Sequence, residues 1–344
     1  MIAGLDIEMR DLDDWLSRHV AGFSGLRKVV KFDTGQSNPT YRIDAASGCY
    51  VLRAKPPGKL LKSAHMVERE YRVMAALFNS AVPVPRMYCL AENCQSPIGR
   101  AFFVMEYLPG RIFWDPALPE LEASERAEVY GAMNATLAAL HGVDLAAAGL
   151  SDFGKPGNYF ARQFERWSAQ YRASALVANA DMVRTMDWLA ANLPPDDGQV
   201  ALVHGDFRLD NMIFHAFEPR VIGLLDWELS TLGHPLADLA YQCSQWRLPH
   251  VGGMRGLGGL DRAALGLPSE ADYVAVYLRR RGLERIDNWQ FYTAFSFFRI
   301  AAILAGVVRR AHDGNASNPE SARGYADAIP VLAAKAVAAI EGRG

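Results

Sequence analysis

The stretch that decides the fold is residues 203–211, VHGDFRLDN, which is followed at residues 224–228 by LLDWE. A short apolar run leads into the first stretch and predicts a strand that ends at its His-Gly-Asp turn. Two further apolar runs, 212–214 and 221–225, have a Glu-Pro turn between them and predict a hairpin. The hairpin returns the second stretch to the place where the first strand ends.

This arrangement brings two kinds of oxygen-bearing side chain to one place. Asn211 and Asp226 are ligands of the type that suits Mg²⁺, which takes few protein oxygens together with phosphate. Asp206 is then left to orient, or to accept a proton from, an attacking hydroxyl, so the pattern favours phosphoryl transfer. The simpler alternative is a strand end whose Asp and Asn only bond the backbone of the turn.

The pattern H-G-D-x-x-x-x-N, followed by a strand that ends in Asp, resembles the catalytic signature of aminoglycoside phosphotransferase-like and choline kinase-like enzymes. The resemblance implies that Asp206 is the catalytic base and that Asn211 and Asp226 bind Mg²⁺. It makes Glu228 a weaker candidate for a second metal. Arg208, two residues after the base, stands where a cation offsets charge on the transferred phosphoryl group, and a plain surface Arg is the alternative.

The rest of the chain agrees with the α+β, protein-kinase-like two-lobed fold that this resemblance implies. Residues 1–108 are expected to form a β-rich N-terminal lobe with one helix, and residues 109–344 a larger, mainly helical lobe with the catalytic loop and the substrate region. The pattern of the small lobe predicts strands at 27–34, 40–44 and 50–54, a helix at 63–79, and strands at 86–91 and 101–108.

The small lobe is expected to hold ATP. Backbone N–H groups in the turn between its first two strands can face phosphate oxygens, and no Walker motif occurs. By the resemblance, backbone groups at the end of its last strand bond adenine. The candidate nucleotide-binding residues of these two segments are Gly35, Gln36, Ser37 and Asn38 in the turn, and Glu106 and Leu108 at the strand end.

The third strand offers two cations on one face, Arg53 and Lys55, because residues two apart on a strand point the same way. The resemblance places Arg53 on the α- and β-phosphates, with Lys55 as the alternative. Its partner carboxylate is then Glu70 on the following helix, or Glu68, which faces elsewhere. An exposed position on the helix surface is the alternative for Glu70.

Two runs, at residues 224–241 and 297–304, are similar to kinase-like domains fused to acyl-CoA dehydrogenases. This branch implies a small-molecule hydroxyl substrate, such as a hydroxyacyl compound carried on CoA. An aminoglycoside or other amino-alcohol phosphotransferase, and an inactive nucleotide-binding module, are the alternatives. Arg299 lies in the second run, and it is either a buried, paired structural residue or a contact for a substrate anion. Asp238 in the first run is expected to cap a helix.

The composition is that of a globular protein with no preference for nucleic acid. Lys plus Arg is 36 and Asp plus Glu is 38, so the net charge of −2 provides no basic field. The four Cys residues match no zinc pattern. The start of the chain lacks the features of a signal peptide, and the apolar run 295–308 is too short to cross a bilayer. A cytoplasmic protein without membrane contact is therefore expected.

Overall fold

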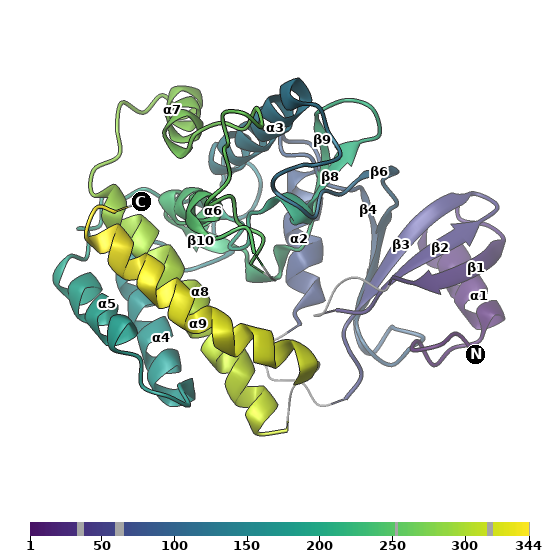
Figure 1. The fold of residues 1–344 in the computed structure, drawn as a ribbon. Coiled ribbons are helices and arrows are strands. Elements are labelled where there is room, and N and C mark those ends of the chain that lie inside the picture. The colour runs from purple at the N-terminus through teal and green to yellow at the C-terminus, as the bar shows by residue number, and fades with distance from the viewer. Residues whose placement is uncertain (33–37, 59–64, 252–253, 315–318, 344) are drawn as a thin grey trace. The chain divides into compact units, whose positions relative to one another are not determined.

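The computed structural model describes residues 1–32, 38–58, 65–251, 254–314 and 319–343. The chain divides into two compact units. Unit 1 contains Met1–Ile112, Ala146–Leu150 and Asn211–Ser230, and unit 2 contains Phe113–Leu145, Ser151–Asp210 and Thr231–Gly344. The fold is α+β, with an antiparallel sheet in unit 1 and mainly helices in unit 2 (Figure 1).

Unit 1 is built on a five-stranded antiparallel sheet in the order β1-β2-β3-β5-β4. The strands expected from the sequence are all present among the described residues, and the predicted helix is shorter than expected. The elements are α1 (Met9–His19), β1 (Leu26–Lys31), β2 (Thr40–Ala45), β3 (Gly48–Ala54), α2 (Val67–Leu77), β4 (Met87–Ala91) and β5 (Phe102–Glu106).

Helix α1 closes one face of this sheet (Figure 1). Strand β2 alternates between buried and half-buried side chains, as expected for a strand with one face on a core. Trp15 from α1 packs edge-on against Phe102 of β5, with ring centroids 5.0 Å apart. This core fixes the central strand β3, which carries Arg53 and is paired on both sides, to β2 and to β5.

A second, three-stranded sheet of unit 1 has the order β6-β8-β9. Its strands are β6 (Gly110–Arg111), β8 (Met212–His215) and β9 (Val221–Leu224), and β8 and β9 form the predicted hairpin. The short helix η2 (Trp227–Leu229) follows β9. A Cβ on Gly110 would lie 2.2 Å from the carbonyl oxygen of Phe214, so only glycine allows β6 to pair there.

Unit 2 is mainly helical. Among its described residues, a two-stranded sheet pairs β7 (Ala201–Val203) with β10 (Thr231–Gly233), a strand that the sequence did not indicate. Its helices are α3 (Ala123–His141), α4 (Tyr159–Ser174), α5 (Ala180–Ala191), α6 (Leu236–Arg247), α7 (Glu270–Arg281), α8 (Trp289–His312) and α9 (Pro319–Ile340), and η1 (Leu209–Asn211) lies at the border with unit 1.

Helix α8 is the central helix of unit 2, and α4, α6 and α9 all pack against it (Figure 1). The expectation that its apolar run is too short for a bilayer is wrong: the helix covers 24 residues and is long and apolar enough by length and composition. Of its most apolar window, 72% is buried inside the protein. Burial inside the protein accounts for the apolar character of α8, because a helix with apolar residues on all sides is stable where other helices surround it.

Candidate functional site

The turn after β7 is held by side chains from two helices of unit 2. The carboxylate of Asp238 on α6 accepts hydrogen bonds from the backbone N–H of His204 (2.6 Å) and of Gly205 (2.8 Å). Arg299 on α8 donates from Nη2 to the carbonyl oxygen of Gly205 at 2.7 Å. The backbone immediately before Asp206 is thus fixed on both its N–H and its C=O sides.

The structure corrects the expected role of Asp238. It does not cap α6, because that helix begins after Pro235 and Asp238 is its third residue. Its buried carboxylate also lies 3.4 Å from Nε2 of His141 on α3. Burial raises the pKa of Asp238, but His141, His204 and the Gly205 N–H together lower it by more than burial raises it. The pKa of Asp238 is therefore below its ordinary value. Asp238 is therefore charged, and it anchors the turn.

Asp206 is oriented by a tyrosine that sequence reasoning missed. The hydroxyl of Tyr241 on α6 donates a short hydrogen bond to Oδ1 of Asp206. The Asp206 backbone N–H donates to Nδ1 of His204, whose ring is fully buried. Burial and the Asp206 carboxylate raise the pKa of Tyr241, so the phenol keeps its proton and remains a donor. The only sequence feature that could have indicated Tyr241 is its spacing of three residues from Asp238, which places both side chains on one face of a helix.

Arg208 lies on the exposed side of the same turn. Its Nε is 3.5 Å from a carboxylate oxygen of Asp206, and its Nη2 is 3.1 Å from Asp210. Burial raises the pKa of Asp210, and the nearby Asp206 adds to that rise while Arg208 opposes it. The Arg208 side chain is 46% exposed, so it is accessible to an anion as well as paired. Its predicted role at a phosphate stays a prediction.

In unit 1, three predicted site residues form one ion cluster. The Nε of Arg53 lies 3.1 Å from Glu70, and its Nη2 lies 2.7 Å from Oδ1 of Asp226. The exposed alternative for Glu70 is wrong, because its side chain is only 1% exposed. Asn38 adds a hydrogen bond from its side-chain amide to Glu70 at 2.9 Å.

The charges in this cluster perturb each other. Burial alone would lower the pKa of Arg53, but the carboxylates of Glu70, Asp226 and Glu228 outweigh it and raise the value. Burial raises the pKa of Glu70 to about 7, against the opposing effect of Arg53. The negative charge of Glu228 raises both the pKa of Arg53 and the pKa of Glu70. The cluster is thus a concentration of carboxylates held by one arginine.

Lys55, the alternative to Arg53, makes a separate pair with Glu68 at 2.5 Å. Arg53 of β3 and Lys55, which directly follows that strand, therefore pair with two different carboxylates of α2, and of these two cations only Arg53 is linked to Asp226. The predicted phosphate-covering residues Gly35, Gln36 and Ser37 lie outside the described residues.

The predicted metal ligands lie on the hairpin of unit 1. The N–H of Leu225 donates to the carbonyl oxygen of Asn211 at 2.9 Å, which brings the two segments together. Asp226 has φ +64°, a left-handed conformation that Asp and Asn adopt more readily than other non-glycine residues and that often marks functional sites. The Asn211 amide and the carboxylates of Asp226 and Glu228 are hard oxygen donors, and Mg²⁺ prefers such ligands. Within the described ranges, no group of three His, Cys, Asp or Glu side chains forms a metal cage.

The predicted adenine contacts lie at the end of β5. The backbone N–H of Glu106 donates to the carbonyl of Arg86 at 2.8 Å, and its side chain accepts the Arg86 N–H at 3.1 Å. That N–H is therefore not available to a nucleotide. Leu108 follows, and a Cβ on Gly223 would lie 2.5 Å from its Cδ1. In the described part of the chain, no hydrogen bond or ion pair links these two residues to the Arg53 cluster.

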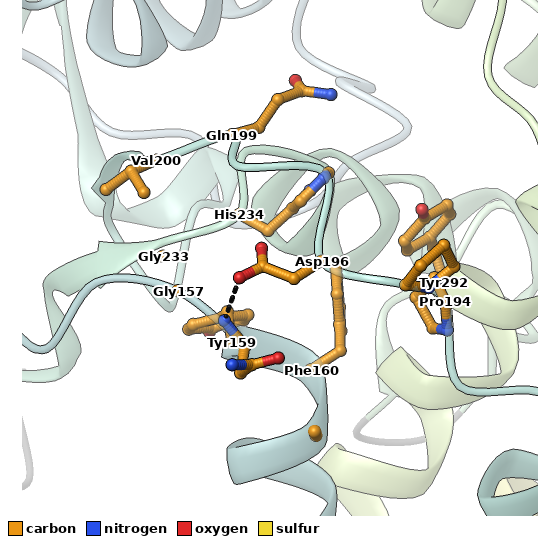
Figure 2. Close-up of a pocket in the computed structure, with 13 residues that line it drawn as sticks. Gly157, Tyr159, Phe160, Pro194, Asp196, Gln199, Val200, Gly233, His234 and Tyr292 are labelled. Carbon is orange, nitrogen blue, oxygen red and sulfur yellow. Dashed lines mark hydrogen bonds between the residues drawn. The ribbon is translucent and has the colours of Figure 1, made fainter.

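A separate small pocket lies in unit 2 (Figure 2). Asp196 bonds the backbone N–H of Asn158 at its edge, at 2.9 Å. None of the predicted catalytic, nucleotide or metal residues lines it. The lining residues are Gly157, Asn158, Tyr159, Phe160, Ala161, Pro194, Pro195, Asp196, Gln199, Val200, Gly233, His234 and Tyr292.

Comparison with known proteins gives a consistent result. The family model described as "Phosphotransferase enzyme family" matches residues 28–281. The chain is 48% identical over 311 residues to acyl-CoA dehydrogenase family member 10 of Mus musculus, covering 89% of this chain and 29% of that protein. The chain thus spans less than half the length of the curated relatives it matches.

Two solved structures show the same fold. A Ralstonia eutropha protein, provisionally assigned as an aminoglycoside phosphotransferase, is 44% identical, with a TM-score of 0.88 and coverage of 98% of this chain and 99% of that one. The aminoglycoside phosphotransferase APH(4)-Ia, in a ternary complex with AMP-PNP and hygromycin B, has a TM-score of 0.60 at 18% identity, covering 94% and 99%. The second likeness is one of fold.

Proposed function

The chain belongs to the phosphotransferase enzyme family, and from this membership we propose that it is an ATP- and Mg²⁺-dependent kinase acting on a hydroxyl group of a small molecule. The observation that carries this proposal is the cluster in which Arg53 binds Glu70 and Asp226 at once. One cation of the central strand is held between a buried helix carboxylate and the carboxylate that follows the hairpin, as the family resemblance implies for a nucleotide site.

The proposed chemistry needs little from the protein beyond position and charge. Asp206 orients the substrate hydroxyl and accepts its proton, and Tyr241 holds one of its two oxygens in place. Arg208 supplies positive charge to the phosphoryl group while it is transferred. Because the backbone of 204–206 is anchored by Asp238 and Arg299, Asp206 is preorganised before substrate binds.

We propose Asn211 and Asp226 as the Mg²⁺ ligands and Glu228 as a further ligand. The ion would neutralise the phosphate charges of the nucleotide. In the structure Asp226 is paired with Arg53, so this carboxylate is already oriented by a cation.

Nucleotide use is supported by the complex of a structural neighbour with AMP-PNP, and we propose unit 1 as the part that binds the nucleotide. We assign phosphate contacts to Arg53 and to residues 35–38, and adenine contacts to the backbone at Glu106 and Leu108. Since the N–H of Glu106 is taken by Arg86, its carbonyl and the N–H of Leu108 are the proposed contacts.

For the acceptor, we propose a hydroxyacyl compound. Support comes from the 48% identity to a protein named as an acyl-CoA dehydrogenase family member, although the chain matches only 29% of that protein. An aminoglycoside acceptor is the second candidate, because two of the solved neighbours are complexes with hygromycin B and with spectinomycin. A panel of hydroxyacyl compounds and aminoglycosides, assayed for ADP release, separates the two.

The first experiment measures unfolding temperature with ATP, with and without Mg²⁺. Ligand at a hundredfold its dissociation constant adds about 2.7 kcal/mol to the native state. The variant Asp226→Asn keeps a residue that tolerates the left-handed backbone while removing the charge. Asp187→Asn, on the exposed surface of α5, is the matched control.

We expect a Mg²⁺-dependent rise in the native chain and in Asp187→Asn, and its loss in Asp226→Asn. An equal rise in both variants would refute the metal assignment. No rise with ATP, GTP or ADP in any of the three proteins would refute the kinase proposal.

A further inference from the structure

The guanidinium of Arg299 is a buried cation without a carboxylate partner. Arg299 as a whole is 8% exposed. Among the described residues, its guanidinium makes one hydrogen bond, from Nη2 to the carbonyl oxygen of Gly205 at 2.7 Å. No carboxylate of the described residues lies within ion-pair distance of it. Arginines this buried are normally paired, because an isolated charge is costly to remove from water.

Two carboxylates at the turn that Arg299 contacts are committed elsewhere. Asp238 accepts the N–H groups of His204 and Gly205 and contacts His141. Asp206 accepts the hydroxyl of Tyr241. Arg299 therefore does not owe its place in the fold to an ion pair, and the alternative of a paired structural arginine is not what the structure contains.

Aromatic rings, not acids, surround this guanidinium. Its central carbon lies 5.8 Å from the ring centroid of Trp167 on α4 and 5.6 Å from that of Tyr241 on α6. Rings at this distance compensate a cation only in part. A guanidinium has five N–H donors in a planar fork that matches a carboxylate or a phosphate, and one of them is used by Gly205.

The position of this cation ties it to the reacting group. Tyr241 lies between the two: its ring is next to Arg299, and its hydroxyl is bonded to Asp206. An anion on Arg299 and a hydroxyl on Asp206 would then be about one tyrosine ring apart. A short carbon chain spans that separation.

We propose that Arg299 binds an anionic group, carboxylate or phosphate, of the acceptor whose hydroxyl is phosphorylated. This inference rests on the proposed kinase function. It makes Arg299 a specificity-determining residue, with Trp167 and Tyr241 as the apolar walls of the anion site. Polycationic acceptors are excluded from such a site by charge repulsion.

The test compares acceptors that differ only in charge. The 2-, 3- and 4-hydroxybutyrates are each paired with the corresponding uncharged hydroxybutyramide, and ATP-dependent ADP release is measured. The coenzyme A thioester of each acid is a third arm, in which the carboxylate is masked and only phosphates are anionic. Each acceptor is also tested for binding by its effect on the unfolding temperature, and inorganic phosphate serves as a probe in that assay.

The variants are Arg299→Met, which removes the charge, and Arg299→Lys, which keeps it without the fork. Arg166→Met is the matched control, because Arg166 is an exposed arginine over the same Trp167 ring, at 4.9 Å. Native-like circular dichroism is required of each. If Arg299→Met does not fold, Arg299→Lys carries the comparison.

We expect Arg299→Met to raise the KM for the anionic acceptor about 10- to 100-fold, the usual value of hydrogen bonds to a charged group, with the KM for ATP unchanged. The preference for acid over amide should disappear, and Arg166→Met should keep it. If Arg299→Met raises the KM only for the thioester, the anion bound by Arg299 is a phosphate. If it raises the KM for the free acid, the anion is a carboxylate.

Three results decide against one proposal or the other. An equal fall in kcat for acid and amide, with the preference retained, would mean that Arg299 only supports Gly205 and would overturn the anion site. No binding of acid, thioester or phosphate by the native chain would overturn it as well. Anion binding that Arg299→Met abolishes, without phosphoryl transfer to any acceptor, would keep the site and refute the kinase function.

Discussion

Replacing Arg53 with Met should destabilise unit 1 far more than replacing Lys55 with Met. Arg53 is the cation between the buried Glu70 and Asp226, and removal of one partner of a buried pair costs about 3–5 kcal/mol. Lys55 pairs with the partly exposed Glu68, and such pairs contribute about 0–1 kcal/mol. The free energy of unfolding in urea at pH 8, measured for both variants, gives the comparison.

The loss should also depend on pH, with a sign set by Glu70. Its pKa in the folded chain is about 7, above the ordinary 4.5, so the protonated form is the one the fold favours. A difference of 7 − 4.5 = 2.5 pH units corresponds to about 3 kcal/mol, lost as the pH rises through that range. Without Arg53 the pKa of Glu70 rises further, so Arg53→Met should be destabilised more at pH 8 than at pH 5.

Glu70→Gln supplies the control for this pH dependence. It cannot ionise, so its stability should vary less between pH 5 and pH 8 than that of the native chain. Combined with Arg53→Met, it should recover part of the loss at pH 8. A cost below about 1 kcal/mol for Arg53→Met, or equal costs at pH 5 and pH 8, would refute the reasoning.

Four further substitutions test three separate features. Gly110→Ala should lower the free energy of unfolding by about 1–3 kcal/mol, because the added Cβ meets the Phe214 carbonyl. Gly131→Ala, where α3 leaves open space, should raise the free energy of unfolding by about 0.5–1 kcal/mol. If urea unfolding finds Gly110→Ala as stable as Gly131→Ala, the packing described for Gly110 is wrong. Ser269→Ala removes the N-cap of α7 and should cost about 1 kcal/mol in the same assay, and no change would mean the cap is dispensable. Burial lowers the pKa of His141, so stability should fall as the pH drops below 6.5, and His141→Gln should flatten that decline in acid unfolding curves.

The sequence predicted local structure well because the local signals were strong. The strand runs of unit 1 and the hairpin after Asn211 show clear β-type composition and turn residues, and they are present. β10 was missed because it is three residues long and is defined only by its pairing with β7. No period can be read from a segment of that length.

The candidate site was predictable in its reactive residues and not in their supports. The motif located Asp206, Asn211 and Asp226, whose assigned chemistry stays a proposal. The groups that hold the turn come from positions 33 to 94 residues away in the chain, on α6 and α8. Asp238 was misread as a helix cap because, in sequence, an acid near a helix start has that meaning, whereas its bonds to the turn exist only in the folded chain.

The dependence of the 204–206 turn on distant helices affects how this motif should be used to judge shortened genes. A product that stopped after β10 would still contain every residue of the stretch 203–228 and would score as an intact kinase signature. It would lack Asp238, Tyr241 and Arg299, and with them the groups that anchor the turn and orient Asp206. For proteins of this kind, the presence of α6 and α8 is the better criterion of a formed catalytic turn.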